Sequence, residues 1–145
     1  MIDVENYKRF FLFGVISVLI ITILSYLYNI YSLKYFSNDN FSITKGICVK
    51  EDYDRYNTDK YWYKADNKIY SVSTRSENLK LDEKYYVLYS NERNDLSIIL
   101  TDCDVNKTIN KDDIDIKSNW IYTSNNIVKR KDVPKKYRNF FGINY

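Results

Sequence analysis

The hydrophobic and polar positions divide the chain into two unlike parts. No charged residue occurs from Phe10 to Leu33, and the most apolar part of this run extends from Phe10 to Leu24. A helix rises about 1.5 Å per residue, so one over 10–33 is long enough to cross a hydrocarbon core of roughly 30 Å. The pattern predicts a leader at 1–9 and a transmembrane helix at 10–33, followed by the functional domain.

The apolar run is interpreted as an uncleaved anchor. It is longer than the roughly 7–15 apolar residues of a signal peptide, and no small-residue cleavage site follows it. The alternative is a buried helix of a soluble protein, but so small a domain rarely surrounds a helix on every side. Tyr26, Tyr28, Tyr31 and Tyr35 near the exit fit an interfacial belt, and they can also pack on the downstream domain.

The orientation in the membrane rests on a small difference in basic residues. Lys8 and Arg9 precede the apolar run, whereas Lys34 and Lys45 follow it. The positive-inside rule counts lysine and arginine near the helix ends, and a short basic leader is retained easily in the cytoplasm. We therefore expect a single-pass protein of the cell membrane with its C-terminal domain outside the cytoplasm.

A period of two in apolar positions follows a short polar linker at 34–42, and this period is typical of strands. The expected strands are 43–53, 60–65, 69–74, 84–89 and 96–100. Asp66-Asn67 fits the centre of a two-residue hairpin, because both residues tolerate positive φ. The pattern predicts a mainly β fold, a small antiparallel five-stranded meander or barrel over 43–105.

Alternation also predicts which side chains share a face of the sheet. The expected groups are Ile43, Ile47 and Val49; Tyr61, Tyr63 and Ala65 opposite Trp62; and Tyr85, Val87 and Tyr89 opposite Tyr86 and Leu88. Beyond these strands, the extension at 106–145 contains a candidate edge strand at Ile114, Ile116 and Trp120 to Tyr122. A short helix is expected from Asp132 to Phe141, with Asp132 as its N-cap and Pro134 in its first turn.

Three segments resemble a family of membrane-anchored bacterial β-domains of unknown function. They are Thr44 to Val49 in the first strand, Asp66 to Tyr70 at the hairpin, and Leu81 to Ser90 before the last turn. The resemblance covers about residues 10–100. Arg93-Asn94-Asp95 replaces the family's usual Asn-Pro, and Glu83 replaces its usual glycine. The resemblance implies an anchored β-domain and no catalytic residue.

The net charge of +3 is unevenly distributed. The stretch from Val128 to Tyr145 carries six basic residues and one acidic residue, Asp132, so its charge is +5 and that of the rest is −2. The six basic residues are Lys129, Arg130, Lys131, Lys135, Lys136 and Arg138. These residues are the candidate contact with an anionic surface. The tail can touch anionic lipid head groups, bind an acidic partner, or form a solvated, partly disordered end.

Catalytic chemistry finds little support in the sequence. The chain has no histidine, which removes the commonest general base and neutral metal ligand. No nucleophile elbow or phosphate-binding glycine motif occurs. We therefore expect no enzyme, no cofactor, no metal site and no catalytic residue.

Cys48 and Cys103 are the only cysteines. They are too far apart in sequence for a two-cysteine redox or zinc motif. If the first and last strands pair, as closure of a barrel would require, the two thiols can approach and form a disulfide in an oxidising compartment. Two independent, partly buried thiols are the alternative.

Two patterns in the sequence resemble binding motifs, and a simpler interpretation is favoured for each. Asp102, Asp104, Asn106 and Asp113 have the spacing of a calcium loop, but Lys107 stands where the turn needs glycine, which favours a solvated turn. Seven aromatic residues recur along the strands as candidates for stacking on nucleic acid: Tyr61, Trp62, Tyr63, Tyr70, Tyr85, Tyr86 and Tyr89. The strand region is not basic, so no nucleic-acid partner is expected.

These features favour a non-catalytic, membrane-tethered interaction or structural module of a bacterial cell envelope, with an unknown protein partner. A small accessory or immunity-type protein that binds one dedicated protein partner is the alternative. A thiol-dependent redox protein would need a reactive, low-pKa Cys48 or Cys103.

Overall fold

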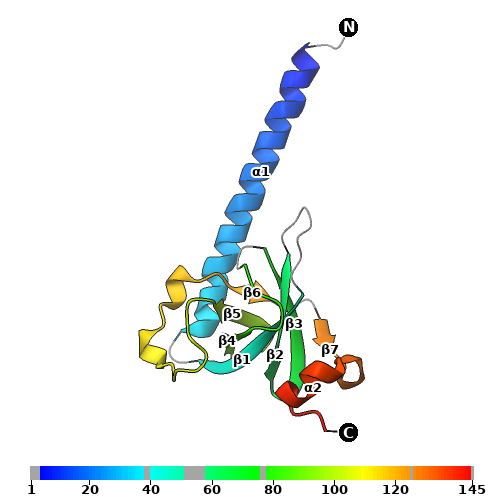
Figure 1. Cartoon of the computed structure of the whole chain (residues 1–145). Coiled ribbons are helices and arrows are strands. Elements are labelled where there is room, and N and C mark those ends of the chain that lie inside the picture. Colours follow the sequence, from blue (N-terminus) through cyan, green and yellow to red (C-terminus); the bar gives the residue numbers. More distant parts are fainter. Residues whose placement is uncertain (1–3, 38–39, 51–57, 76–77, 125, 145) are drawn as a thin grey trace.

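The structure is a computed structural model that describes residues 4–37, 40–50, 58–75, 78–124 and 126–144. A single long helix, α1 (Val4–Leu33), projects from one end of a curled antiparallel sheet, as Figure 1 shows. The N-terminal part of α1 extends far beyond the domain, whereas its C-terminal part lies against it. The chain is therefore mainly β with one long N-terminal helix, as the sequence predicts.

Helix α1 is the one helix among the described residues that is long and apolar enough to cross a membrane. None of its most apolar stretch is buried, and large apolar side chains from Phe10 to Tyr31 are exposed around it. Two of its hydroxyl groups are satisfied within the helix: Ser17 Oγ donates to Phe13 O and Thr22 Oγ1 to Val18 O, each at 2.8 Å. Such a helix suits a hydrocarbon environment, in which every polar group needs an internal partner.

Seven strands form one antiparallel sheet in the described part of the chain. They are β1 (Phe41–Lys50), β2 (Asp59–Ala65), β3 (Lys68–Thr74), β4 (Lys84–Ser90), β5 (Leu96–Leu100), β6 (Tyr122–Thr123) and β7 (Asn126–Val128). Their order is β6-β5-β4-β1-β2-β3-β7, so β1 lies at the centre. Asp66 and Asn67 both have positive φ and join β2 to β3, which confirms the predicted hairpin.

The sheet curls into a half-barrel whose inner face is filled with side chains. Tyr61 and Tyr63 of β2, Cys48 of β1, and Val87 of β4 belong to one buried cluster on this face. The curl also brings the β6 end of the sheet toward β3, because Ser124 Oγ donates to Ser71 O at 3.0 Å. The predicted faces of β2 and β4 are confirmed, since Trp62 and Leu88 belong to clusters on the outer face.

Two further clusters cover the outer face of the sheet. Phe36, Leu88 and Ile98 pack with the segment that carries Ile109 and Ile121. Ile47 and Ile69 pack with the C-terminal segment, including helix α2 (Lys135–Phe141). Ile43 therefore belongs to a different cluster from Ile47 and Val49, although all three lie on the same face of β1. The region after β5 completes the core.

The strand count and the C-terminal elements differ from the prediction. There are seven described strands rather than five, because β6 pairs with β5 and β7 pairs with β3. The predicted edge strand is only two residues long and begins at Tyr122, whereas Ile116 lies in the 3₁₀ helix η3 (Ile116–Ser118) and Ile114 lies outside any strand. Residues 51–53 of the first predicted strand and 76–77 of a predicted loop lie outside the described residues.

The predicted N-cap of the C-terminal helix is wrong. Asp132 ends the 3₁₀ helix η4 (Arg130–Asp132), and Pro134 is the N-cap of α2, with no side-chain cap. Proline fixes its own φ but donates no backbone hydrogen bond, so the helix starts after it. The segment expected as a linker at 34–42 contains the 3₁₀ helix η1 (Lys34–Phe36) and the first residues of β1.

Candidate functional site

The C-terminal part of α1 is fixed to the β domain by specific polar contacts. Asn29 Oδ1 accepts a hydrogen bond from Ile121 N at 3.1 Å, and the Tyr28 and Thr123 hydroxyl groups lie 2.8 Å apart. One turn later, Ser32 is only 1% exposed. The domain therefore sits against the last turns of the helix instead of hanging from a flexible tether.

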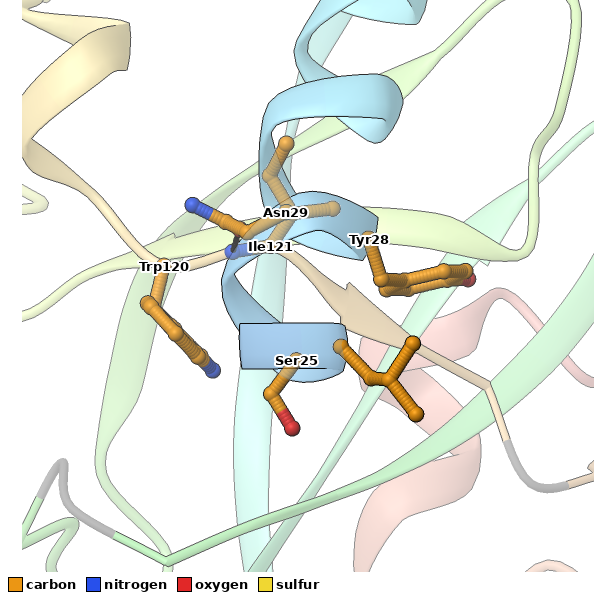
Figure 2. Close-up of a pocket in the computed structure, with 6 residues that line it drawn as sticks. Ser25, Tyr28, Asn29, Trp120 and Ile121 are labelled. Atoms are coloured by element: carbon orange, nitrogen blue, oxygen red, sulfur yellow. Dashed lines mark hydrogen bonds between the residues drawn. The ribbon is translucent and has the colours of Figure 1, made fainter. Parts of the chain in front are cut away.

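An open groove lies at this junction, with a volume of about 450 Å³. We call it the junction groove; its lining residues are Leu24, Ser25, Tyr28, Asn29, Trp120 and Ile121. Figure 2 shows the indole of Trp120, from the segment before β6, beside the α1 turns that carry Ser25 and Asn29. The lining combines apolar surface with hydroxyl, amide and indole groups and contains no charged side chain.

Aromatic and basic side chains meet just beyond the junction groove. Lys34 Nζ lies 3.7 Å from the ring centre of Tyr31, and the Arg93 guanidinium lies 5.7 Å from that of Tyr35. Arg93 also forms a 2.6 Å ion pair with Asp95, and this hydrogen-bonded carboxylate raises the pKa of the guanidinium. Paired aromatic and cationic groups at the end of an apolar helix are typical of a membrane–water boundary.

The six basic residues of the tail form the second candidate site, which we call the basic surface. They lie on η4, on α2 and at Lys129 just before η4. Five are exposed, and Arg138 is half-buried with its Nε donating to Val133 O at 3.1 Å. Figure 1 places α2 on the side of the domain away from the protruding part of α1.

Asp82 fixes α2 to the sheet and occupies part of the basic surface. Its carboxylate accepts hydrogen bonds from Tyr137 Oη at 2.5 Å and from Lys136 Nζ at 2.9 Å. The Tyr137 hydrogen bond, followed by that of Lys136, lowers the pKa of Asp82 below its usual value. Lys136 is thus partly neutralised, which leaves Lys129, Arg130, Lys131 and Lys135 as the exposed cations of this surface.

The aromatic residues weighed as nucleic-acid contacts belong mainly to the core. Tyr63 stacks on Tyr70 with ring centres 5.4 Å apart, and on Tyr89 at 6.1 Å. Tyr61 and Ser97 hydroxyl groups lie 2.8 Å apart across the half-barrel, and Tyr63 Oη donates to Asn94 O at 2.6 Å. Burial raises the pKa of Tyr63 far above its usual value. These rings pack the interior and offer no open stacking face.

No disulfide joins the two cysteines, and they lie on opposite faces of the sheet. Cys48 is fully buried on the inner face, whereas Cys103 packs on the outer face. The strand pairing that would bring them together is absent from the described sheet, because β1 is central and lies between β4 and β2. The condition for a disulfide, pairing of the first and last strands, is therefore not met among the described residues, and the two thiols lie apart.

The segment weighed as a calcium loop is an exposed turn. Asp104 Oδ1 accepts a hydrogen bond from Asn106 N at 3.0 Å, which closes a local turn. Asp102 and Asp113 are exposed, and they border a small cavity that also contains Cys103. No group of three or more candidate metal ligands occurs among the described residues.

Comparison of the chain with models of protein families, with curated proteins and with solved structures gave no match. The resemblance to membrane-anchored bacterial β-domains therefore stays a prediction.

Sequence reasoning missed the junction groove. The sequence feature that points to this groove is Asn29, the one amide side chain within the uncharged run from Phe10 to Leu33. A polar side chain in such a helix usually finds a partner, but only the structure identifies that partner as Ile121, which is 92 positions away.

Proposed function

We propose that the protein is a non-catalytic module that is tethered to a bacterial cell membrane by α1 and that presents its β domain at a fixed position above the bilayer. The main support is the junction: Tyr28 and Asn29 of α1 are hydrogen-bonded to Thr123 and Ile121 of the domain. A flexible tether would let a domain search the surroundings, whereas this arrangement sets its height and orientation.

The same contacts favour a retained anchor over a cleaved signal sequence. Ser32 and Phe36 are 1% and 2% exposed, so the end of the apolar segment is part of the folded domain. Cleavage after the apolar run would remove Asn29 and leave Ile121 N without its acceptor. A buried donor that loses its partner costs about 1–3 kcal/mol.

We further propose that the domain lies outside the cytoplasm, as the basic leader favours. The test uses a chain with Cys48→Ala and Cys103→Ser, with one new cysteine at Asn91 or at Asn6, both of which are exposed. In intact cells without an outer membrane, an impermeant maleimide should label the Asn91→Cys chain. The Asn6→Cys chain should be labelled only after lysis. The reverse pattern would place the domain in the cytoplasm.

The partner surface that we propose is the basic surface, and its partner is an acidic protein. Support comes from four exposed cations, Lys129, Arg130, Lys131 and Lys135, in a chain whose remaining charge is negative. Their side of the domain faces away from the protruding part of α1, which favours a partner over the lipid head groups around the anchor.

The experiment is crosslinking in native membranes followed by affinity isolation. One variant carries Lys129→Glu, Arg130→Glu and Lys131→Glu. The control variant carries Lys107→Glu and Lys117→Glu, two exposed lysines in the segment between β5 and β6. We expect the first variant to lose the crosslinked partner and the control to keep it. Equal capture by both would overturn the basic surface as the contact.

A small accessory or immunity-type protein that binds one dedicated partner remains the alternative, and the same isolation distinguishes it. A single stoichiometric partner supports that reading, whereas several partners support a general interaction module. A thiol-dependent redox function has weaker support, since Cys48 is fully buried and lies on the other face from Cys103.

A further inference from the structure

The position of the junction groove along α1 sets its depth relative to a bilayer. Lys8 and Arg9 are the last charges before the apolar run, so a hydrocarbon core begins near Phe10. A core of about 30 Å takes up about 20 helical residues, and this span ends near Asn29. The lining residues Leu24 to Asn29 therefore lie in the last turns of the span, where hydrocarbon meets the head groups.

Trp120 extends this boundary from the helix to the domain. Its side chain is 47% exposed although it lines the groove beside Leu24 and Ser25. Tryptophan is enriched at membrane interfaces, because its ring is apolar and its indole N–H requires a hydrogen-bond acceptor. Tyr26 and Tyr31 are also exposed near this level of α1, at 60% and 56%.

The polar groups of the groove are mainly hydrogen-bond donors. Asn29 Oδ1 is already used by Ile121 N, so the Asn29 amide presents its NH₂ group. The indole of Trp120 can only donate, and no acceptor for it occurs among the described residues. Leu24 adds an apolar wall. Uncharged donors beside an apolar wall match the ester carbonyls and upper acyl chain of a glycerolipid, rather than a charged head group.

We propose that the junction groove holds the glycerol-ester region of a bilayer glycerolipid, which seats Trp120 in the interfacial layer of the membrane that α1 spans. This inference rests on the membrane tethering proposed above and adds that the domain itself contacts lipid. The lipid would fill the space between helix and domain and reinforce the orientation that the Asn29 and Tyr28 hydrogen bonds define.

The test uses the two tryptophans of the full chain, reconstituted into phosphatidylcholine vesicles. The unmodified chain contains Trp62 and Trp120, and Trp120→Phe leaves only Trp62. Trp62 is a built-in control, because it packs against Tyr137 and Phe141 beneath α2. Since Trp120 is about half exposed, the Trp120→Phe chain should fold normally. Fluorescence is compared in vesicles whose lipids carry bromine either near the ester groups or near the chain ends, since bromine quenches tryptophan on contact.

The unmodified chain should lose a larger fraction of its emission than the Trp120→Phe chain when bromine lies near the ester groups, because an indole in the interfacial layer meets those groups. Bromine near the chain ends should quench it less. Equal quenching of both chains, in protein that floats with the vesicles, would overturn the lipid contact while leaving the anchor intact. Stronger quenching from the chain ends would contradict the ester-level position. Protein that does not float would instead contradict the tethering.

Discussion

At the residue scale, the tolerance of the fold depends on which face of a strand a side chain occupies. Val87 lies in the middle of β4 on the filled inner face and is 0% exposed, whereas Lys84 begins the same strand and is exposed. Val87→Asp places a carboxylate among Tyr61, Tyr63 and Val72 without a partner, which should cost more than about 3 kcal/mol. Lys84→Asp should change stability little. Thermal melts of the detergent-solubilised chains compare the two, and equal melting temperatures would contradict the assigned inner face.

A second residue-scale prediction concerns the close approach at Gly46. A Cβ there would lie 2.7 Å from Val87 Cγ2 and 3.0 Å from Trp62 O, so the neighbouring strands leave no room for a side chain. Gly46→Ala should destabilise the domain by about 1–3 kcal/mol through overpacking. Gly14→Ala in α1 is the matched control, because nothing lies within 4 Å of its added Cβ. Chemical unfolding measures the stability of both variants. An unchanged unfolding midpoint for Gly46→Ala would show that β1 and β4 lie further apart than the structure places them.

At the element scale, the docking of α2 should depend on pH through Asp82. Hydrogen bonds from Tyr137 and then Lys136 lower the pKa of Asp82 in the folded chain. A lowered folded-state pKa stabilises the fold above the unfolded value of about 3.9 and loses that effect as the pH falls through the folded value. Trp62 emission reports the docking, because its ring contacts Tyr137 and Phe141.

Asp82→Asn isolates this effect, since asparagine also accepts the positive φ of 64° found at this position. Both chains carry Trp120→Phe, so that Trp62 alone emits. The chain that keeps Asp82 should show an acid-induced change in Trp62 emission below about pH 4, and the Asp82→Asn chain should not. The same acid transition in both chains would show that protonation of Asp82 does not cause it.

The elements also show how far sequence patterns reach. Alternation predicts β2 to β5 to within one or two residues, and Asp66-Asn67 predicts their first hairpin, because these signals are local. Strands β6 and β7 are two and three residues long and pair with partners distant in sequence, as Ser97 does with Tyr122. No local period identifies such strands. The junction was missed for the same reason: Asn29 and Ile121 meet only through tertiary structure.

At the scale of the whole molecule, the boundary between the exposed apolar segment and the folded domain lies within α1. Removing residues 1–24 leaves Asn29 and the buried Phe36 in place, whereas removing residues 1–36 takes both away. Loss of a buried phenylalanine costs about 3–5 kcal/mol. The shorter deletion should therefore give a soluble domain that melts well above the longer one. Equal melting temperatures would mean that the end of α1 does not contribute to the fold.

The central claim is that α1 is a permanent transmembrane anchor built into the β domain. Its most direct test is intact-mass analysis of the protein recovered from carbonate-washed cell membranes. The account predicts that an uncleaved chain, with α1 retained, stays in the membrane pellet, because its apolar helix is exposed and its last turns are part of the fold. Recovery of the protein in the carbonate supernatant, or of a shortened chain that lacks α1, would contradict it.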